Sequence, residues 1–183
     1  MRILGLSGSL REDSHNTRLL AGVSALLPSG VELVVFDGLA AVPHYNEDDE
    51  LPTPAAVAAL ASAVAEADAV LISTPEYNGS IPGQLKNALA WISRPAAGAP
   101  LRGRPAAVIG ASTGLFGAVW AQAEMRKVLS TMGARVVDRE LPIGQADEAL
   151  GPDGLPVEPD AVRELGTLLT ELIELTEPMR EAA

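Results

Sequence analysis

The chain has 183 residues, of which 48% are hydrophobic and 20% charged, a balance typical of a folded globular domain. Its formal net charge of −11 argues against binding to nucleic acid or to an anionic membrane surface, because their phosphate groups would be repelled. With no cysteine and two histidines, the sequence excludes disulfides and thiol catalysis and predicts no metal site. We expect a single cytoplasmic domain over residues 1–183, with no membrane-spanning segment.

Five short apolar runs predict strands, at residues 2–7, 31–37, 69–74, 105–112 and 134–138. Helices are predicted between them from apolar residues at helical spacing. The first carries Leu19 to Leu27, and the second opens with Thr53 as N-cap and Pro54 just inside. The third has Pro82 in its first turn and reaches Ile92, and the fourth runs from Ala118 to Met132. Residues 142–157 are expected to be a loop, followed by a final helix from about Pro159.

Strands and helices alternate throughout, which predicts an α/β fold with a parallel sheet between two layers of helices. Five such units in this length favour the flavodoxin-like strand order 2-1-3-4-5. Ligands of such folds bind beyond the carboxyl ends of the strands, near the point where the strand order reverses. Three unusual segments occupy those ends, namely GSLREDSHN, TPEYNGS and ASTGLFG. The sequence therefore predicts one crevice lined by all three.

The first of these segments has the composition of an anion site. It offers serine hydroxyls, the guanidinium of Arg11 and the amides of a helix N-terminus, which together suit a terminal phosphate monoester. It is not a dinucleotide fingerprint, because Gly5 and Gly8 are spaced G-x-x-G, and no Walker sequence is present. An ordinary strand-to-helix turn, with Ser14 or Asn16 as the cap, is the alternative interpretation.

The second segment, TPEYNGSIPG, contains more than helix-start chemistry. Ser80 and Pro82 are residues that commonly begin a helix. Pro75 and Gly79 are expected to shape the backbone so that its amides face a flat ligand, with Tyr77 as an aromatic wall. The third segment, Ser112-Thr113-Gly114, offers small residues where a ligand can approach the backbone closely.

Together, GSLR-x-x-S-x-N and PEYNGSIPG-x-LKNALAW resemble the NADPH-dependent FMN reductase family, which includes quinone, chromate and azo-dye reductases. The similarity extends from Met1 through the fourth helix and is weak beyond about residue 140. It implies a reductase that uses NADPH or NADH as co-substrate and transfers hydride through FMN to quinone-like acceptors or to free flavin. It also implies a homodimer or homotetramer.

The resemblance further implies a set of cofactor-binding residues. The FMN phosphate would be held by Ser9, Arg11, Ser14, Asn16 and Thr17. The isoalloxazine would be lined, largely through backbone groups, by Pro75, Glu76, Tyr77, Asn78 and Gly79, and the third loop would contribute Ser112 and Gly114. No proton-transfer catalyst is expected, because the cofactor carries the chemistry. The chain departs from many relatives at Ala90, where they have an acid, and from some at Gly79, where they have an aromatic residue.

A different class of protein, a flavodoxin-like FMN electron carrier that does not oxidise nicotinamide, is the alternative. The phosphate loop of such a carrier is usually a T-G-x-T turn without arginine.

Two of the remaining residues have two possible interpretations. Tyr45 and Asn46 either reach the flavin of a neighbouring subunit or belong to a solvated loop. We expect His15 to be a turn residue, His44 to be exposed and the acids at 47–50 to be solvated. Trp91 and Trp120 are expected to be packing or interface residues, and Arg126 and Glu140 to lie near subunit contacts.

Overall fold

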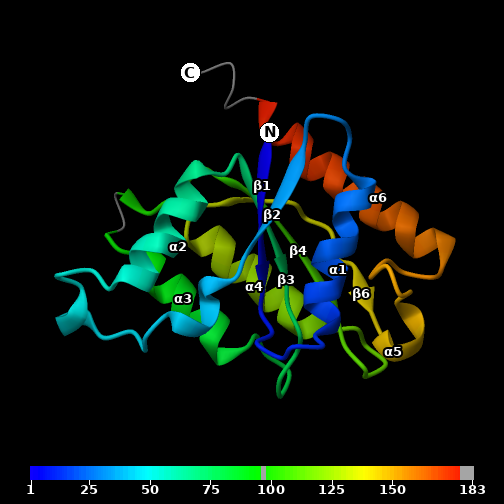
Figure 1. The fold of residues 1–183 in the computed structure, drawn as a ribbon, viewed down its shortest axis with the longest axis horizontal. Coiled ribbons are helices and arrows are strands. Elements are labelled where there is room, and N and C mark those ends of the chain that lie inside the picture. Colours follow the sequence, from blue (N-terminus) through cyan, green and yellow to red (C-terminus); the bar gives the residue numbers. More distant parts are fainter. Residues whose placement is uncertain (96–97, 178–183) are drawn as a thin grey trace.

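A parallel sheet with helices on both faces forms the centre of the computed structural model, which describes residues 1–95 and 98–177 (Figure 1). The long path of the sheet has the order β2-β1-β3-β4-β5. Its strands are β1 (Arg2–Ser7), β2 (Glu32–Phe36), β3 (Ala69–Ser73), β4 (Pro105–Ala111) and β5 (Arg135–Val136). Every pairing in it is parallel. The predicted fold class and strand order are confirmed.

The last predicted strand and the loop after it are corrected by the structure. The strand expected over 134–138 is only two residues long, because β5 pairs with β4 at Pro105 and Ala106 alone. The chain then returns as β6 (Pro142–Ile143), which pairs with the other end of β4, at Gly110 and Ala111. A short helix, α5 (Ala146–Ala149), follows inside the predicted loop. Two-residue strands have no periodicity to read, so this pairing is visible only in three dimensions.

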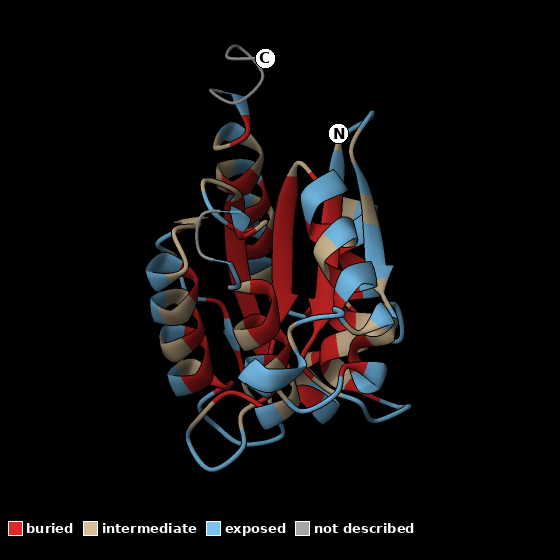
Figure 2. Cartoon of the chain, turned by 90° about the vertical axis from the view of Figure 1, so that its left-hand side faces the viewer, coloured by how far each residue is buried: buried red, intermediate tan, exposed pale blue. Residues whose placement is uncertain are grey.

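The helices form two layers. On one face of the sheet lie α2 (Ala55–Glu66), α3 (Gly83–Ile92) and α4 (Val119–Thr131), packed over Leu4 and Leu6 of β1. On the other lie α1 (His15–Val23) and α6 (Pro159–Glu174), packed over Ile3. Successive side chains of β1 thus enter opposite cores, as strand geometry requires. Figure 2 shows buried central strands between helices whose outer faces are exposed, whereas β2, at the edge of the sheet, is largely exposed. Short 3₁₀ helices at Ser24–Leu26, Gly38–Ala41 and Glu47–Asp49 complete the described elements.

The helix starts differ in part from those predicted. Ser14 caps α1 as one alternative expected, since its Oγ accepts a hydrogen bond from the Thr17 amide at 3.3 Å. Thr53 does not cap α2, because its hydroxyl donates to the Glu50 carbonyl and Pro54 takes the N-cap position. Pro82 likewise precedes α3 instead of lying in its first turn. None of the helices in residues 1–95 and 98–177 has the length and apolar content needed to cross a membrane.

Candidate functional site

The three unusual segments follow β1, β3 and β4, which are neighbours in the sheet, and they gather at its carboxyl edge (lower edge in Figure 1). Gly8 brings the first two together. Its amide donates to the Ser73 carbonyl at 2.8 Å, and a Cβ at this position would lie 2.9 Å from Leu85 Cδ2 and 3.2 Å from Pro75 Cδ. We call the segments after β1, β3 and β4 the first, second and third connections. A side chain at Gly8 would push the first connection away from the second. The predicted convergence of these segments is thus a property of the fold.

Asn16 fixes the start of α1 to the ends of two strands. It is buried, and its Oδ1 accepts hydrogen bonds from the Ala111 amide at 3.0 Å and the Ser73 hydroxyl at 2.9 Å. Its Nδ2 donates to the Ala111 carbonyl at 2.9 Å. Asn16 is therefore not the cap of α1. Its side chain joins the first connection to β3 and β4, a role that sequence reasoning missed because its partners lie 57 and 95 residues away.

The first connection leaves cationic and hydrogen-bonding groups available. Arg11 is exposed, and its guanidinium makes no hydrogen bond or ion pair with any residue that the structure describes. The Ser9 hydroxyl accepts from the Arg11 amide at 3.4 Å, which keeps it on the same turn. The first amides of a helix have no partner within the helix, so α1 adds free donors at this point. This donor set fits the phosphate of FMN.

Three further hydroxyls of this connection stabilise its own conformation. Ser14 is buried and caps α1, and the Ser7 and Thr17 hydroxyls lie 2.8 Å apart. These hydrogen bonds fix the conformation of the turn without a bound anion.

The second connection is a tight hairpin. The amide of Tyr77 donates to the Ser80 carbonyl at 3.0 Å, and the Ser80 amide returns a bond to the Tyr77 carbonyl at 3.2 Å. Asn78 and Gly79 both have positive φ, of 55° and 73°, as a type I′ turn requires. The Asn-Gly pair is thus explained by the turn itself, and the sequence signal for it is local and could have been recognised. The Tyr77 side chain is 52% exposed.

Two glutamates attach this hairpin to α4. Glu76 Oε2 accepts hydrogen bonds from the Trp120 amide at 3.0 Å and the Ala121 amide at 3.1 Å, which are orphan donors of the helix N-terminus. The N-cap residue of α4, Ala118, has no side-chain acceptor, so Glu76 supplies it from another loop. In return, Glu124 Oε2 accepts from the Ser80 hydroxyl at 2.6 Å. The Glu76 carboxylate is therefore engaged within the protein.

The third connection rests on β6 and α5. The Ser112 amide donates to the Ile143 carbonyl at 3.0 Å, and the Gly114 carbonyl accepts from the Gln145 amide at 3.0 Å. A Cβ on Gly144 would lie 2.2 Å from the Leu115 carbonyl oxygen, so only glycine permits this approach. The segment predicted as a loop therefore supports the third wall of the crevice.

The structure confirms some of the predictions made for the histidines and tryptophans and corrects others. His44 is exposed as expected, whereas His15 is the first residue of α1, with Nε2 3.1 Å from Asp147 Oδ1 of α5. Trp91 is a packing residue as expected, being buried with its indole N–H donated to the Pro43 carbonyl at 2.8 Å. Trp120 is 52% exposed and is not part of the core, so of its two predicted roles only that of a subunit-contact residue stays a prediction.

Tyr45 packs within its own chain. Its ring lies edge-on against Trp91 with the centroids 5.0 Å apart, and its hydroxyl donates to Glu50 Oε1 at 2.8 Å. This hydrogen bond raises the pKa of the Tyr45 phenol, with burial and the Glu50 charge adding to the effect. The neighbouring acids Glu47, Asp48 and Asp49 are exposed, as expected for a solvated run. Arg126 forms an ion pair with Glu140 within the chain.

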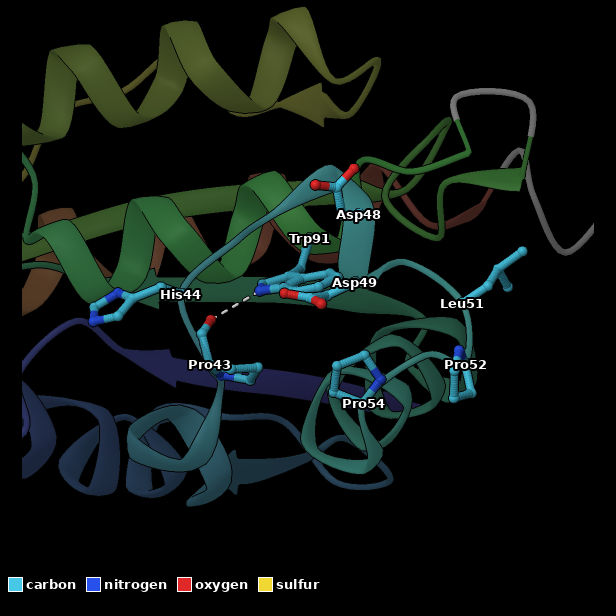
Figure 3. Close-up of a pocket in the computed structure, with 8 residues that line it drawn as sticks. All are labelled: Pro43, His44, Asp48, Asp49, Leu51, Pro52, Pro54 and Trp91. Carbon is cyan, nitrogen blue, oxygen red and sulfur yellow. Dashed lines mark hydrogen bonds between the residues drawn. The ribbon is translucent and has the colours of Figure 1, made fainter.

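A separate pocket of about 390 Å³ lies beside Trp91 (Figure 3). Prolines form much of its wall, together with His44, two aspartates and Leu51. Trp91 stands in the last turn of α3, whereas the second connection enters the first turn of that helix. Ten helical residues span about 15 Å, so this pocket is distinct from the three connections at the strand ends, none of whose residues line it.

The fold is that of a flavodoxin-like α/β protein, with the three connections gathered at the carboxyl edge of its sheet. The family model for NADPH-dependent FMN reductases matches residues 1–148, and the chain belongs to this family. It is 40% identical over 167 residues to an NAD(P)H-dependent FMN reductase of Pseudomonas aeruginosa, covering 90% of this chain and 89% of that one.

Two further proteins extend the comparison. A 2-hydroxy-1,4-benzoquinone reductase of a Burkholderia species is 35% identical over 170 residues, covering 92% of both chains. The solved structure of a flavoenzyme NAD(P)H:(acceptor) oxidoreductase from Paracoccus denitrificans superposes with a TM-score of 0.84, at 33% identity and 97% coverage of each chain. The predicted family, its oxidoreductase class and its use of FMN and NAD(P)H are confirmed.

Proposed function

We propose that this protein reduces quinone-like acceptors or free flavin with NAD(P)H, through an FMN held in the crevice. The single observation that supports this most directly is the unpaired guanidinium of Arg11 beside the N-terminus of α1. In a chain of net charge −11, an exposed arginine at a helix N-terminus and at the strand ends has the chemistry of a phosphate site. The names of the relatives from Pseudomonas and Burkholderia point to the same acceptors.

We assign the cofactor contacts as follows. Ser9, Arg11 and the amides before Thr17 hold the phosphate, whereas Ser14 and Asn16 position them through the bonds described above. The backbone of residues 75–79 lines the isoalloxazine, with Tyr77 at its edge. Ser112 and Gly114 complete the third side, on the support of β6 and α5.

No side chain in this assignment has to move a proton as a catalyst. When bound, FMN would supply the hydride- and electron-transfer chemistry between the nicotinamide and the acceptor. Overall, NAD(P)H and one proton from solvent convert a quinone to its hydroquinone and leave NAD(P)⁺. The protein's own tasks would be to bind the phosphate and to orient the ring, and these tasks need only backbone groups, hydroxyls and arginine.

This assignment predicts ping-pong kinetics. The flavin fills much of a crevice built from three connections, so nicotinamide and quinone must use the same open face in turn. Double-reciprocal plots with NAD(P)H varied at several quinone concentrations should give parallel lines. Intersecting lines, with FMN shown to stay bound, would require a ternary complex and a second substrate pocket.

We further propose a cytoplasmic homodimer or homotetramer with a crevice near the interface. The loop around Asn46 is largely exposed, whereas Tyr45 packs against Trp91 of its own chain, and we expect the exposed residues of this loop to contact a partner subunit. Light scattering at micromolar concentration should give a mass of two or four chains. A monomeric mass with full activity would contradict this proposal.

A further inference from the structure

Three aromatic side chains are exposed at the carboxyl edge of the sheet. The chain has only two residues each of Trp, Tyr and Phe. Of these, Tyr77, Phe116 and Trp120 are exposed by 52%, 59% and 52%. The other three, Phe36, Tyr45 and Trp91, belong to the core under α2 and α3 or pack against it. Large apolar side chains are rarely left in water together without a binding role.

The exposed aromatic residues belong to the second and third connections, which the structure holds together. The rings of Phe116 and Trp120 meet edge to face, with centroids 5.1 Å apart and an interplanar angle of 62°. The Trp120 amide donates to Glu76, the residue directly before Tyr77. This hydrogen bond therefore ties the hairpin that carries Tyr77 to the start of α4, where Trp120 lies. Leu115, which is 70% exposed, adds apolar surface on the same loop.

We propose that Phe116 and Trp120, with Tyr77, form the surface on which the flat ring of the electron acceptor stacks. The inference rests on the proposed function and deepens it by naming the residues that select the acceptor. Aromatic rings attract one another in stacked or edge-to-face arrangements beyond their buried area. The nearby carboxylates of Glu76 and Glu124 are already bonded to backbone amides and to Ser80, so the surface suits an uncharged ring.

The position of the aromatic residues indicates that they bind an electron acceptor and not the phosphate end of the cofactor. Arg11 and the free amides of α1 lie on the first connection, whereas Phe116 and Trp120 belong to the loop after β4 and the start of α4. A quinone or a free flavin presents a flat ring to such a surface. A compact inorganic oxidant such as ferricyanide has no ring and gains nothing from it.

The first test compares acceptors. Trp120→Ala should lower kcat/KM for a benzoquinone about three- to tenfold more than for ferricyanide, chiefly by raising KM. Trp120→Phe, which keeps a ring, should recover most of the loss. Val157→Ala removes apolar surface from a residue that is 55% exposed on the segment before α6, and it should leave the quinone KM unchanged.

The second test needs no turnover. FMN-loaded protein without NAD(P)H is titrated with the same benzoquinone while tryptophan fluorescence is recorded. Trp91 is buried and Trp120 is exposed, so saturable quenching should come from Trp120 and disappear in Trp120→Phe. Quenching that persists unchanged in that variant would overturn the proposal.

Three other outcomes would also be decisive. Equal quinone KM values for wild type and Trp120→Ala, with a smaller mass of the variant in light scattering, would show that the aromatic surface contacts a second copy instead. Failure of the wild-type protein to oxidise NAD(P)H with either acceptor would overturn the proposed function, and this inference with it. Retained ferricyanide reduction with an unchanged quinone KM in the variant would overturn the inference alone.

Discussion

Asn16→Ala is expected to lower the free energy of unfolding by about 3–5 kcal/mol, because it leaves three buried groups without partners at about 1–3 kcal/mol each. These groups are the amide and carbonyl of Ala111 and the hydroxyl of Ser73. In a chain of this size, the melting temperature should fall by about 10 °C or more. Chemical denaturation monitored by circular dichroism measures the effect.

A matched control is available at Asn46. It is exposed and accepts a bond from the Asp48 amide at the start of a short 3₁₀ helix. Removal of that cap, in Asn46→Ala, should lower stability by at most about 1 kcal/mol. If Asn16→Ala were no more destabilising than Asn46→Ala, Asn16 would not be the tie between α1 and the strand ends that the structure shows.

Arg11→Ala is expected to raise the Kd for FMN about ten- to a hundredfold, because charge-assisted hydrogen bonds contribute about 1.5–3 kcal/mol. Stability without FMN should change little, since the guanidinium has no partner within the described residues. Arg11→Lys should recover part of the affinity, as it keeps the charge and loses the planar fork. Titration followed by flavin fluorescence gives the Kd directly.

Riboflavin makes this test specific for the phosphate. It has the same ring and no phosphate, so Arg11→Ala should leave its weaker binding unchanged. Arg163→Ala serves as the control variant, because Arg163 is an exposed arginine paired with Asp160 on α6. An equal loss for FMN and riboflavin would place Arg11 against the ring, and no loss for either would remove it from the site.

The sheet could be predicted from the sequence because each long strand is a continuous apolar run and each long helix has a clear period. β3, for example, is buried at all five positions, and its sequence shows this directly. The carboxyl edge then follows from the strand order alone, which is why three separate segments could be assigned to one crevice.

The contacts that shape the crevice could not be predicted in this way. Glu76 caps a helix 44 residues further on, and Asn16 bonds to a strand 95 residues away, so no local pattern reveals either partner. β6 and α5 are stabilised by pairing with β4 and by the close approach at Gly144, not by any periodicity of their own. The Asn-Gly turn at 78–79 is different, since its signal is local and the functional interpretation obscured it.

The central claim, that bound FMN takes hydride from a nicotinamide in this crevice, has one direct measurement. FMN-loaded protein is mixed anaerobically with one equivalent of NADH or NADPH, without any acceptor, and the flavin absorbance is followed. We expect the absorbance of the oxidised flavin to be lost completely with at least one of the two nucleotides. It should recover completely when one equivalent of a quinone is added. Stoichiometric FMN that stays oxidised with both nucleotides would contradict the account and would favour a flavodoxin-like electron carrier.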